Sequence, residues 1–516
     1  MRLSQFVRSA SYVSFVVTAA CMGMGGRKNA MAPPSAEMVA TGGAMYAPEP
    51  STGGEDYTDY GKNPWVAAGE DRFSTFAADV DTASYTIARR KLLEGTLPPA
   101  ASVRVEEWIN YFRYGFPTAE PGTPFSTVMD AAPHPFVADR YVVRVGVATK
   151  AKTVGERKPS ALVFLVDVSG SMDQPDKLGL AKKALHVLTE NLAAKDAVSI
   201  VTYAGDSRVV LPMTSIEHED RIHKAIDSLR SGGGTAMASG MDLAYAQAAQ
   251  WVRPGGISRV IVLSDGDANI GVHSHDEMLK IIETRAKAGV ALSTIGFGMG
   301  NYKDTTMEQL ADKGNGNNYY IDSLDAAKRI FAEQLTSTLE VAAKDVKLQV
   351  EFDPAQVSRY RLVGYENRDV KDEDFRKDAV TGGQVGWGHQ VTAMYEVELT
   401  DGAKGKLAPL GVVHIRHKQP EQDGATESAF TMAAPPASSF AASSPDFRFA
   451  FAVAAFADVM RGGATWSLDD IRAQAAAAAG EVKDRQELVS LIDKARALRG
   501  TQKTIATDAT PATIAQ

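Results

Sequence analysis

Apolar and polar residues follow two different periods along this chain. Between residues 160 and 342, unbroken apolar runs of strand length alternate with segments in which apolar residues recur every three or four positions, the last over residues 324–339. Unbroken runs are typical of strands covered on both faces, and the second pattern is typical of amphipathic helices. The sequence therefore predicts an α/β domain over residues 160–342, built on a doubly wound, mostly parallel sheet.

Strand-like alternation is predicted on both sides of this domain. Residues 121–159 read as β-strands, and residues 343–432 contain four runs in which apolar and polar residues alternate, so we expect a β-rich domain there. One hypothesis is that both sets of strands form a single sandwich into which the α/β domain is inserted. The fold class expected for the whole chain is then α/β with a flanking β-sandwich-like unit.

Short helical regions are predicted near both ends of the chain. Residues 68–120 contain two amphipathic helices, and the second carries Trp108, Tyr111 and Phe112. Aromatic residues at helical spacing form a core more often than a platform for carbohydrate or peptide, so we expect these three side chains to be buried.

The C-terminal part of the chain has its own helical pattern. A linker rich in Ser, Ala and Pro covers residues 433–445, a helical domain covers 446–500, and a tail covers 501–516. The most apolar stretch, residues 447–460, is interrupted by charged residues and is too short to span a bilayer. We expect it to be a buried helix.

Residues 1–21 are typical of an export signal. Arg2 and Arg8 precede a short apolar run over residues 12–20, which ends in small residues before Cys21. This arrangement resembles a bacterial lipoprotein signal, which implies that Cys21 is lipidated and becomes the mature N-terminus. The alternative is an ordinary secretory signal in which Cys21 is incidental. Both interpretations predict an exported protein, and the lipid anchor predicts that it stays in the cell envelope.

The region that follows the signal is predicted to be a flexible tether. Residues 22–67 are rich in Gly, Ala, Pro, Met and Ser and have few periodic apolar positions. In a cell with two membranes, Met22 in place of Asp resembles the sorting pattern for the outer membrane. Because Cys21 is the single cysteine of the chain, disulfides are not expected to hold the exported protein together.

Length and charge narrow the classes of function. A chain of 516 residues is long enough for several domains. Its net charge is −8, and no stripe of basic residues is present that could neutralise phosphates, so nucleic acid is not an expected partner.

The clearest candidate for chemistry lies where the first buried strand of the α/β domain ends. Residues 163–172 read V-F-L-V-D-V-S-G-S-M, so Asp167 terminates an apolar run, and Ser169 and Ser171 follow at alternate positions. Ligands of open α/β sheets collect beyond the carboxyl ends of the strands. One carboxylate and two hydroxyls form a hard oxygen set that suits Mg2+ or Mn2+.

Two later segments can complete this oxygen set. Residues 231–235 read S-G-G-G-T, a glycine loop that presents Thr235 before a helical pattern. Residues 259–265 read R-V-I-V-L-S-D, a second buried strand that ends in Asp265. Both residues are therefore candidate metal ligands.

With these five residues the chain resembles the von Willebrand factor type A family, whose metal-ion-dependent adhesion site has the pattern D-x-S-x-S, then Thr, then Asp. The resemblance implies that Ser169, Ser171 and Thr235 bind the metal directly, that Asp167 and Asp265 act directly or through water, and that a partner's acidic group takes the open position. Residues 68–120 and 446–500 resemble segments that accompany this domain in bacterial surface and periplasmic proteins.

The function expected from the sequence is therefore non-enzymatic. It is an exported module, anchored in the membrane by lipid at Cys21, that captures a carboxylate of a protein partner through a divalent cation. No nucleophile signature or phosphate-binding loop supports catalysis. A metal-dependent hydrolase and a structural envelope protein without metal-dependent binding stay open as alternatives.

Overall fold

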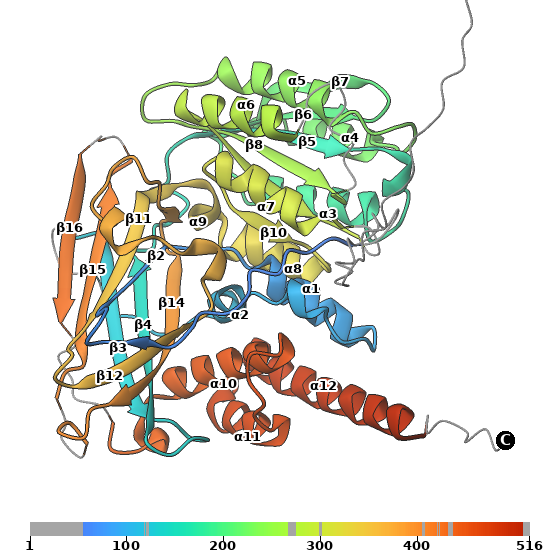
Figure 1. Ribbon diagram of the computed structural model, residues 1–516. Helices are drawn as coiled ribbons and strands as arrows, with labels where there is room; N and C mark the ends of the chain where they lie inside the picture. The colour runs from blue at the N-terminus through green and yellow to red at the C-terminus, as the bar shows by residue number, and fades with distance from the viewer. Residues whose placement is uncertain are drawn as a thin grey trace, which may run out of the picture. The chain divides into compact units, whose positions relative to one another are not determined.

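The computed structural model describes residues 55–117, 119, 123–266, 275–298, 302–404, 408–420, 422, 424–431 and 437–508 (Figure 1). The predicted export signal, Cys21 and residues 22–54 of the predicted tether lie outside the described residues.

A six-stranded sheet forms the centre of the α/β domain. Its strand order is β10-β9-β8-β5-β6-β7, and every neighbouring pair is parallel except β6 with β7. β5 lies inside the sheet and is buried over its whole length, as its unbroken apolar run predicts. The doubly wound, mostly parallel sheet is therefore confirmed. The strands are β5 (Ser160–Asp167), β6 (Ala197–Tyr203), β7 (Ser207–Ser215), β8 (Ile257–Ser264), β9 (Val290–Gly296) and β10 (Asn318–Tyr320).

Helices cover both faces of this sheet because successive side chains of β5 point to opposite faces. Leu162 and Phe164 share a core with α3, α4, α8 and α9, whereas Val163 and Leu165 share another core with α5, α6 and α7. The helices are α3 (Leu178–Glu190), α4 (Glu219–Ser228), α5 (Met237–Ala249), α6 (His275–Lys287), α7 (Asp304–Lys313), α8 (Leu324–Lys328) and α9 (Leu335–Leu339), with short 3-10 turns η2 (Gly170–Met172) and η3 (Ile216–His218).

One helix prediction needs correction. Residues 324–339 were expected to form a single helix, but α8 and α9 are separated by the π-helical segment η4 (Arg329–Glu333). A π-helical turn widens the helix by one residue and rotates the side chains that follow it. Apolar residues before, within and after the π-helical segment, such as Ala327, Phe331 and Leu335, therefore reach the same core.

Two further sheets pack against each other as a sandwich around a shared apolar core. The first has the order β1-β12-β14-β4-β3, and the second has the order β13-β11-β15-β16 with β2 also paired to β11. The chain leaves the first sheet after β4, forms the α/β domain, and returns through β11. The hypothesis of a sandwich interrupted by the α/β domain is therefore confirmed. The strands are β1 (Val66–Ala67), β2 (Phe73–Ala77), β3 (Phe125–Pro133), β4 (Arg140–Thr149), β11 (Val341–Phe352), β12 (Val357–Val363), β13 (Gly383–Gly386), β14 (Gln390–Leu399), β15 (Gly411–Lys418) and β16 (Ala425–Thr431).

Residues 55–67 do not belong to a flexible tether, contrary to the prediction. Residues 55–67 were assigned to the tether, yet Glu55 pairs with the cations of Arg90 and Lys91, and β1 extends the sandwich. The composition of this segment did not indicate that Glu55 forms these ion pairs. Residues 68–120 were expected to be helical, but β2 pairs in antiparallel register with β11 before the helices begin.

Helices from the two ends of the chain form a third apolar core. Trp108 and Phe112 are each 1% exposed, so the prediction that they are core is confirmed, whereas Tyr111 is half-buried and packs against this core. The helices are α1 (Ala83–Leu93), α2 (Val105–Tyr111), α10 (Pro445–Met460), α11 (Leu468–Ala479) and α12 (Lys483–Asp508), with 3-10 turns η1 (Ala100–Ser102), η5 (Glu366–Arg368), η6 (Asp372–Asp374) and η7 (Phe440–Ala442).

Two predicted boundaries fall inside these helices. α10 begins at Pro445, within the predicted linker, because Ser444 caps it by accepting a hydrogen bond from the backbone N–H of Phe447. α12 continues past residue 500 into the predicted tail. Among the helices of the described ranges, none has the length and apolarity needed to cross a membrane.

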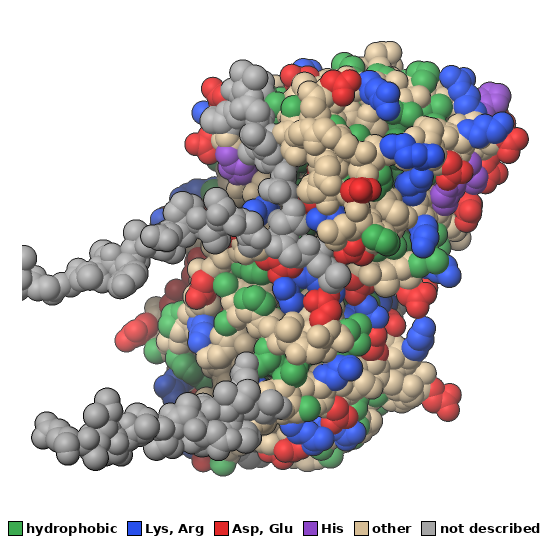
Figure 2. All heavy atoms as spheres, turned by 90° about the vertical axis from the view of Figure 1, so that its right-hand side faces the viewer, with side chains coloured by type: hydrophobic (Ala, Val, Ile, Leu, Met, Phe, Trp, Pro, Cys, Tyr) green, Lys and Arg blue, Asp and Glu red, His purple; other side chains and the backbone are tan. Residues whose placement is uncertain are grey.

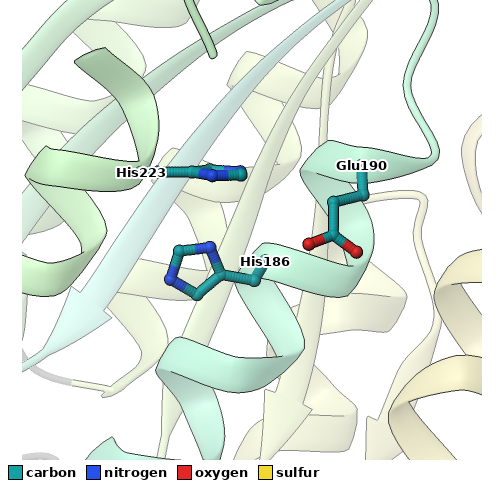
Figure 3. Close-up of side chains that lie close together, drawn as sticks. All are labelled: His186, Glu190 and His223. Atoms are coloured by element: carbon teal, nitrogen blue, oxygen red, sulfur yellow. The ribbon is translucent and has the colours of Figure 1, made fainter. Parts of the chain in front are cut away.

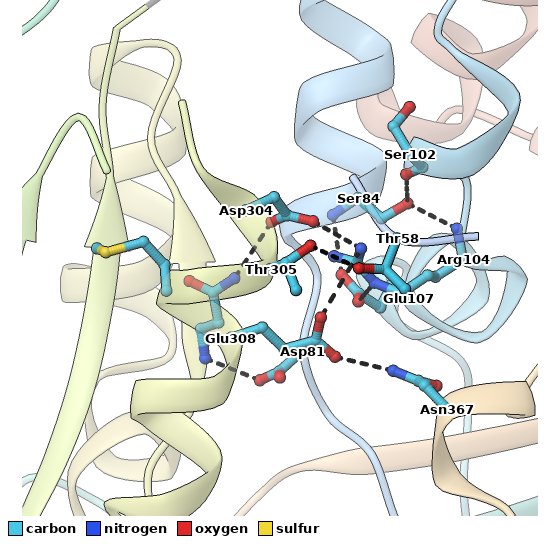
Figure 4. A network of polar contacts seen from close by, with 12 residues as sticks. Thr58, Asp81, Ser84, Ser102, Arg104, Glu107, Asp304, Thr305, Glu308 and Asn367 are labelled. Atoms are coloured by element: carbon cyan, nitrogen blue, oxygen red, sulfur yellow. Dashed lines mark hydrogen bonds and ion pairs between the residues drawn. The ribbon is translucent and has the colours of Figure 1, made fainter. Parts of the chain in front are cut away.

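A buried ionic network connects the N-terminal helices to the α/β domain and the sandwich (Figure 4). Arg104, just before α2, donates to Asp304 of α7 at 2.6 Å and also pairs with Glu107. Asn367 of η5 donates to Glu308 of α7 at 2.8 Å. Since α7 belongs to the α/β domain, these contacts hold that domain against both flanking parts.

Candidate metal-binding site

Two strand ends bring the predicted ligands to one edge of the α/β sheet. β5 and β8 are parallel neighbours, with Val166 opposite Leu263. This register places Asp167 beside Ser264, and the Ser264 hydroxyl donates to Oδ2 of Asp167 at 3.0 Å. Asp265 follows Ser264 directly, and its negative charge raises the pKa of the Asp167 carboxyl group.

The D-x-S-x-S segment forms a hydrogen bond back to its own aspartate, Asp167. The backbone N–H of Ser169 donates to Oδ1 of Asp167 at 2.9 Å, and the hydroxyl oxygens of Ser169 and Ser171 lie 3.0 Å apart. Asp167 and Ser169 are buried, whereas Ser171 is half-buried at the end of the sheet. The carboxylate and the two hydroxyls therefore lie close together.

The glycine loop lies against this segment through backbone hydrogen bonds. The N–H of Gly232 donates to the carbonyl of Val168 at 2.8 Å, and the N–H of Gly170 donates to the carbonyl of Gly233 at 3.1 Å. Thr235, two residues further on, is half-buried. Its loop is thus docked at the site, while its hydroxyl takes no part in the hydrogen bonds that join Asp167, Ser169 and Ser171.

The electrostatics of the site fit a cation. Burial raises the pKa of Asp167, and the charge of Asp265 raises it further, although hydrogen bonds from Ser169 and Ser264 act in the opposite direction. The two buried carboxylates at neighbouring strand ends repel each other, and positive charge beside them lowers this repulsion. With the serine hydroxyls they form an all-oxygen donor set, which is the chemistry that Mg2+ and Mn2+ prefer.

Three residues outside the motif hold the two carboxylates in place. Tyr203, the last residue of β6, donates its hydroxyl to Oδ2 of Asp167 at 3.1 Å, and Ser264 donates to the same oxygen. Lys177 donates from Nζ to Oδ2 of Asp265 at 2.9 Å, and its side chain is only 4% exposed. Ser264 could have been suspected from its place before Asp265. Lys177 and Tyr203 carry no motif that points to this role.

The side chain of Lys177 is enclosed by Gly298, which follows β9. Gly298 has φ +77°, and a Cβ atom added there would come within 2.3 Å of Cγ of Lys177. The carbonyl of Gly298 accepts a hydrogen bond from Nη1 of Arg90 at 2.9 Å. Arg90 belongs to α1, so the N-terminal helices contact the wall of the candidate site.

On the face shown in Figure 2, basic and acidic side chains are interspersed and do not gather into stripes of one sign.

Three family models match the chain. Residues 51–144 match "von Willebrand factor", residues 161–333 match "von Willebrand factor type A domain", and residues 337–498 match "Uncharacterized protein YfbK, C-terminal". The chain is 36% identical over 469 residues to uncharacterized protein YfbK of Escherichia coli, covering 85% of this chain and 80% of that protein.

More distant similarities are confined to part of the chain. It is 26% identical to uncharacterized protein sll0103 of Synechocystis, over 54% of this chain and 66% of that protein. It is 27% identical to the magnesium-chelatase 67 kDa subunit of Chlorobaculum tepidum, over 36% of this chain and 32% of that protein. The structure of a von Willebrand factor type A protein from Catenulispora acidiphila is 19% identical, with a TM-score of 0.42 over 74% of this chain and 91% of that chain.

Proposed function

Because this chain belongs to the YfbK family of von Willebrand factor type A proteins, we propose that it is an exported, non-enzymatic binding protein that captures a carboxylate of a protein partner through a divalent cation. The von Willebrand factor type A domain makes the chain a protein-interaction module. To this interaction role we add three proposals: the cation, the type of partner group and the cellular location.

The residues that would hold the cation are those predicted from the motif: Asp167, Ser169, Ser171, Thr235 and Asp265. A bound Mg2+ or Mn2+ supplies positive charge and an open position for an acidic oxygen of the partner. The observation that carries the proposal is the burial of Asp167 and Asp265 at neighbouring ends of parallel strands, beside the paired hydroxyls of Ser169 and Ser171.

The hydrogen bonds of the two carboxylates favour binding over hydrolysis. A metal-dependent hydrolase needs a general base that can accept a proton from water. Oδ2 of Asp167 already accepts from Tyr203 and Ser264, and Asp265 is paired with Lys177. Neither carboxylate is therefore well placed to act as that base.

Calorimetric titration of Mg2+ and Mn2+ into the full chain tests the cation. We expect saturable heat in the wild-type chain and none in Asp167→Asn, which keeps the shape of the side chain but removes its charge. Asp242→Ala, at an exposed position on α5, is the matched control and should bind normally. Addition of a glutamate-containing peptide should change the heat in the presence of the cation. Absence of heat in the folded wild-type chain, or equal heat in Asp167→Asn, would contradict the proposal.

The proposed lipid anchor at Cys21 needs a separate test. We propose that Cys21 carries the lipid and that the protein lies in the cell envelope, on the outer membrane where two membranes exist. Cys21→Ser should move the protein from the membrane fraction to the soluble exported fraction, and mass spectrometry of the wild-type N-terminus should show a lipid-modified cysteine. Equal membrane association of both forms would contradict the anchor and favour the ordinary secretory signal.

A further inference from the structure

Two histidines and a glutamate come together on α3 and α4 (Figure 3), and none of them is a predicted ligand of the oxygen site. His186 and Glu190 are four residues apart on α3 and therefore share a face of that helix. His223 faces them from α4, and its ring centroid lies 4.5 Å from that of His186. One possible ligand atom from each of the three residues lies within 4.8 Å of the others.

The two imidazoles are accessible, and each lies beside a carboxylate. The side chains of His186 and His223 are 25% and 26% exposed, so an ion can reach them from solvent. Asp227 lies 3.0 Å from Nε2 of His186, and Glu219 lies 3.6 Å from Nε2 of His223. With Glu190, these carboxylates favour a bound cation over two neutral rings alone.

The donor types decide which cation fits. Imidazole nitrogen suits Zn2+, Ni2+ and Cu2+, whereas Mg2+ prefers oxygen ligands. Carboxylates that hydrogen-bond a histidine are the usual outer partners of metal-bound imidazole, and the contact between Asp227 and His186 is of this kind. We propose that His186, Glu190 and His223 form a transition-metal site, selective for Zn2+ or a similar borderline cation, that joins α3 to α4.

This site has a structural consequence that does not depend on the proposed function. α3 begins directly after Lys177, and α4 precedes the glycine loop that presents Thr235. A cation held by both helices would therefore restrain two segments that continue into the oxygen site. It would also stabilise the folded chain, because a ligand that binds only the folded state shifts unfolding to higher temperature.

The test is a calorimetric titration of Zn2+ into the full chain in the presence of excess Mg2+. Absorption spectra of the chain with Co2+ in place of Zn2+ give a second readout. We expect one saturable Zn2+ site, a higher melting temperature with Zn2+, and the visible absorption bands of nitrogen-ligated Co2+. Loss of an outer partner alone weakens metal binding about 10- to 100-fold, so removal of a direct imidazole ligand should weaken it at least about tenfold. His186→Ala and His223→Ala should each show that loss, and Glu190→Gln should show a smaller one.

The matched control is His218→Ala, because His218 is exposed just before α4 and lies outside the cluster. It should bind Zn2+ like the wild type. Asp167→Asn should also keep Zn2+ binding, which separates this site from the proposed oxygen site. Unchanged Zn2+ affinity in the folded double variant H186A/H223A, or no Zn2+ binding by the wild type, would overturn the proposal.

Discussion

Lys177 donates a hydrogen bond from its ammonium group to Oδ2 of Asp265 across 2.9 Å, and both side chains are almost fully buried. A divalent cation at the proposed oxygen site would need the same carboxylate. The ammonium group and the cation therefore compete for the charge of Asp265, and Lys177 should set the cation affinity of the site.

Replacement of Lys177 by Met should strengthen Mg2+ binding, because it removes a positive charge near the cation while keeping the length of the side chain. Without Mg2+ the same variant should be less stable by on the order of 3 kcal/mol, since the buried carboxylate of Asp265 loses its ion pair with the Lys177 ammonium group. Calorimetry measures the first effect and urea unfolding the second.

Lys182→Met is the control for this variant, because the Lys182 ammonium group donates to the backbone carbonyl of Asp227 at the surface. It should leave both the Mg2+ affinity and the free energy of unfolding nearly unchanged. Weaker Mg2+ binding in Lys177→Met than in wild type would show that the ammonium group supports the cation instead of competing with it.

A comparison of two glycine variants distinguishes a steric clash with Lys177 from backbone strain. Gly298 and Gly255 both have positive φ, +77° and +72°, but only at Gly298 would a Cβ atom meet Lys177, and at Gly255 it would meet nothing within 4 Å. Gly255→Ala should cost about 1 to 2 kcal/mol of unfolding free energy from the left-handed backbone alone. Gly298→Ala should cost about 1 to 3 kcal/mol more, because Lys177 must move. Equal losses in urea unfolding would mean that Lys177 adapts freely.

The buried glutamates of α2 predict a pH dependence of stability. Burial raises the pKa of Glu107 from 4.5 to about 8, assisted by the charges of Asp79 and Glu308 and opposed by Arg104. The folded chain keeps this proton at pH values where the unfolded chain loses it. The free energy of unfolding should therefore fall as pH rises from 4.5 towards about 8, the window between the two pKa values.

Urea unfolding between pH 5 and pH 8 measures this dependence, and Glu107→Gln should make it shallower. Glu106, whose pKa burial raises to about 7, should keep part of the slope in that variant. The exposed Glu70 supplies the control, since Glu70→Gln should retain the full wild-type slope. A slope in Glu107→Gln as steep as in wild type would exclude Glu107 as its source.

Trp108 joins the helices from the two ends of the chain. It is 1% exposed, and its ring centroid lies 5.3 Å from that of Phe456 on α10 in an edge-to-face arrangement. Trp108→Ala should lower the free energy of unfolding by about 3 to 5 kcal/mol. Trp251→Ala, at a half-buried position after α5, should cost much less in the same thermal or urea experiment. Similar losses in both variants would mean that Trp108 does not hold the two ends together.

The local pattern of residues along the chain was enough to predict the α/β domain and its candidate ligands. The unbroken apolar run of β5 and the period of the helices are properties of neighbouring residues, and both were confirmed. Asp167, Ser169 and Ser171 lie in one short segment, so their proximity follows from the sequence. The use of this cluster as a cation site stays a prediction.

Segments with mixed composition were predicted less well. Residues 55–67 are polar and lack a period, so nothing in them indicated the ion pairs of Glu55 with Arg90 and Lys91. The break between α8 and α9 was also missed, because a π-helical turn leaves an apolar period almost intact over so few residues.

Most strands and helices, and the residue types at the strand ends, could be predicted from the sequence, because they depend on neighbours along the chain. The folded structure was needed to show that Lys177 pairs with Asp265, that Arg90 donates to the carbonyl of Gly298, and that His186 packs against His223. These partners are far apart in the sequence. They meet because the packing of strands and helices brings distant segments together, and charge or hydrophobicity alone does not specify which of many possible partners will be near.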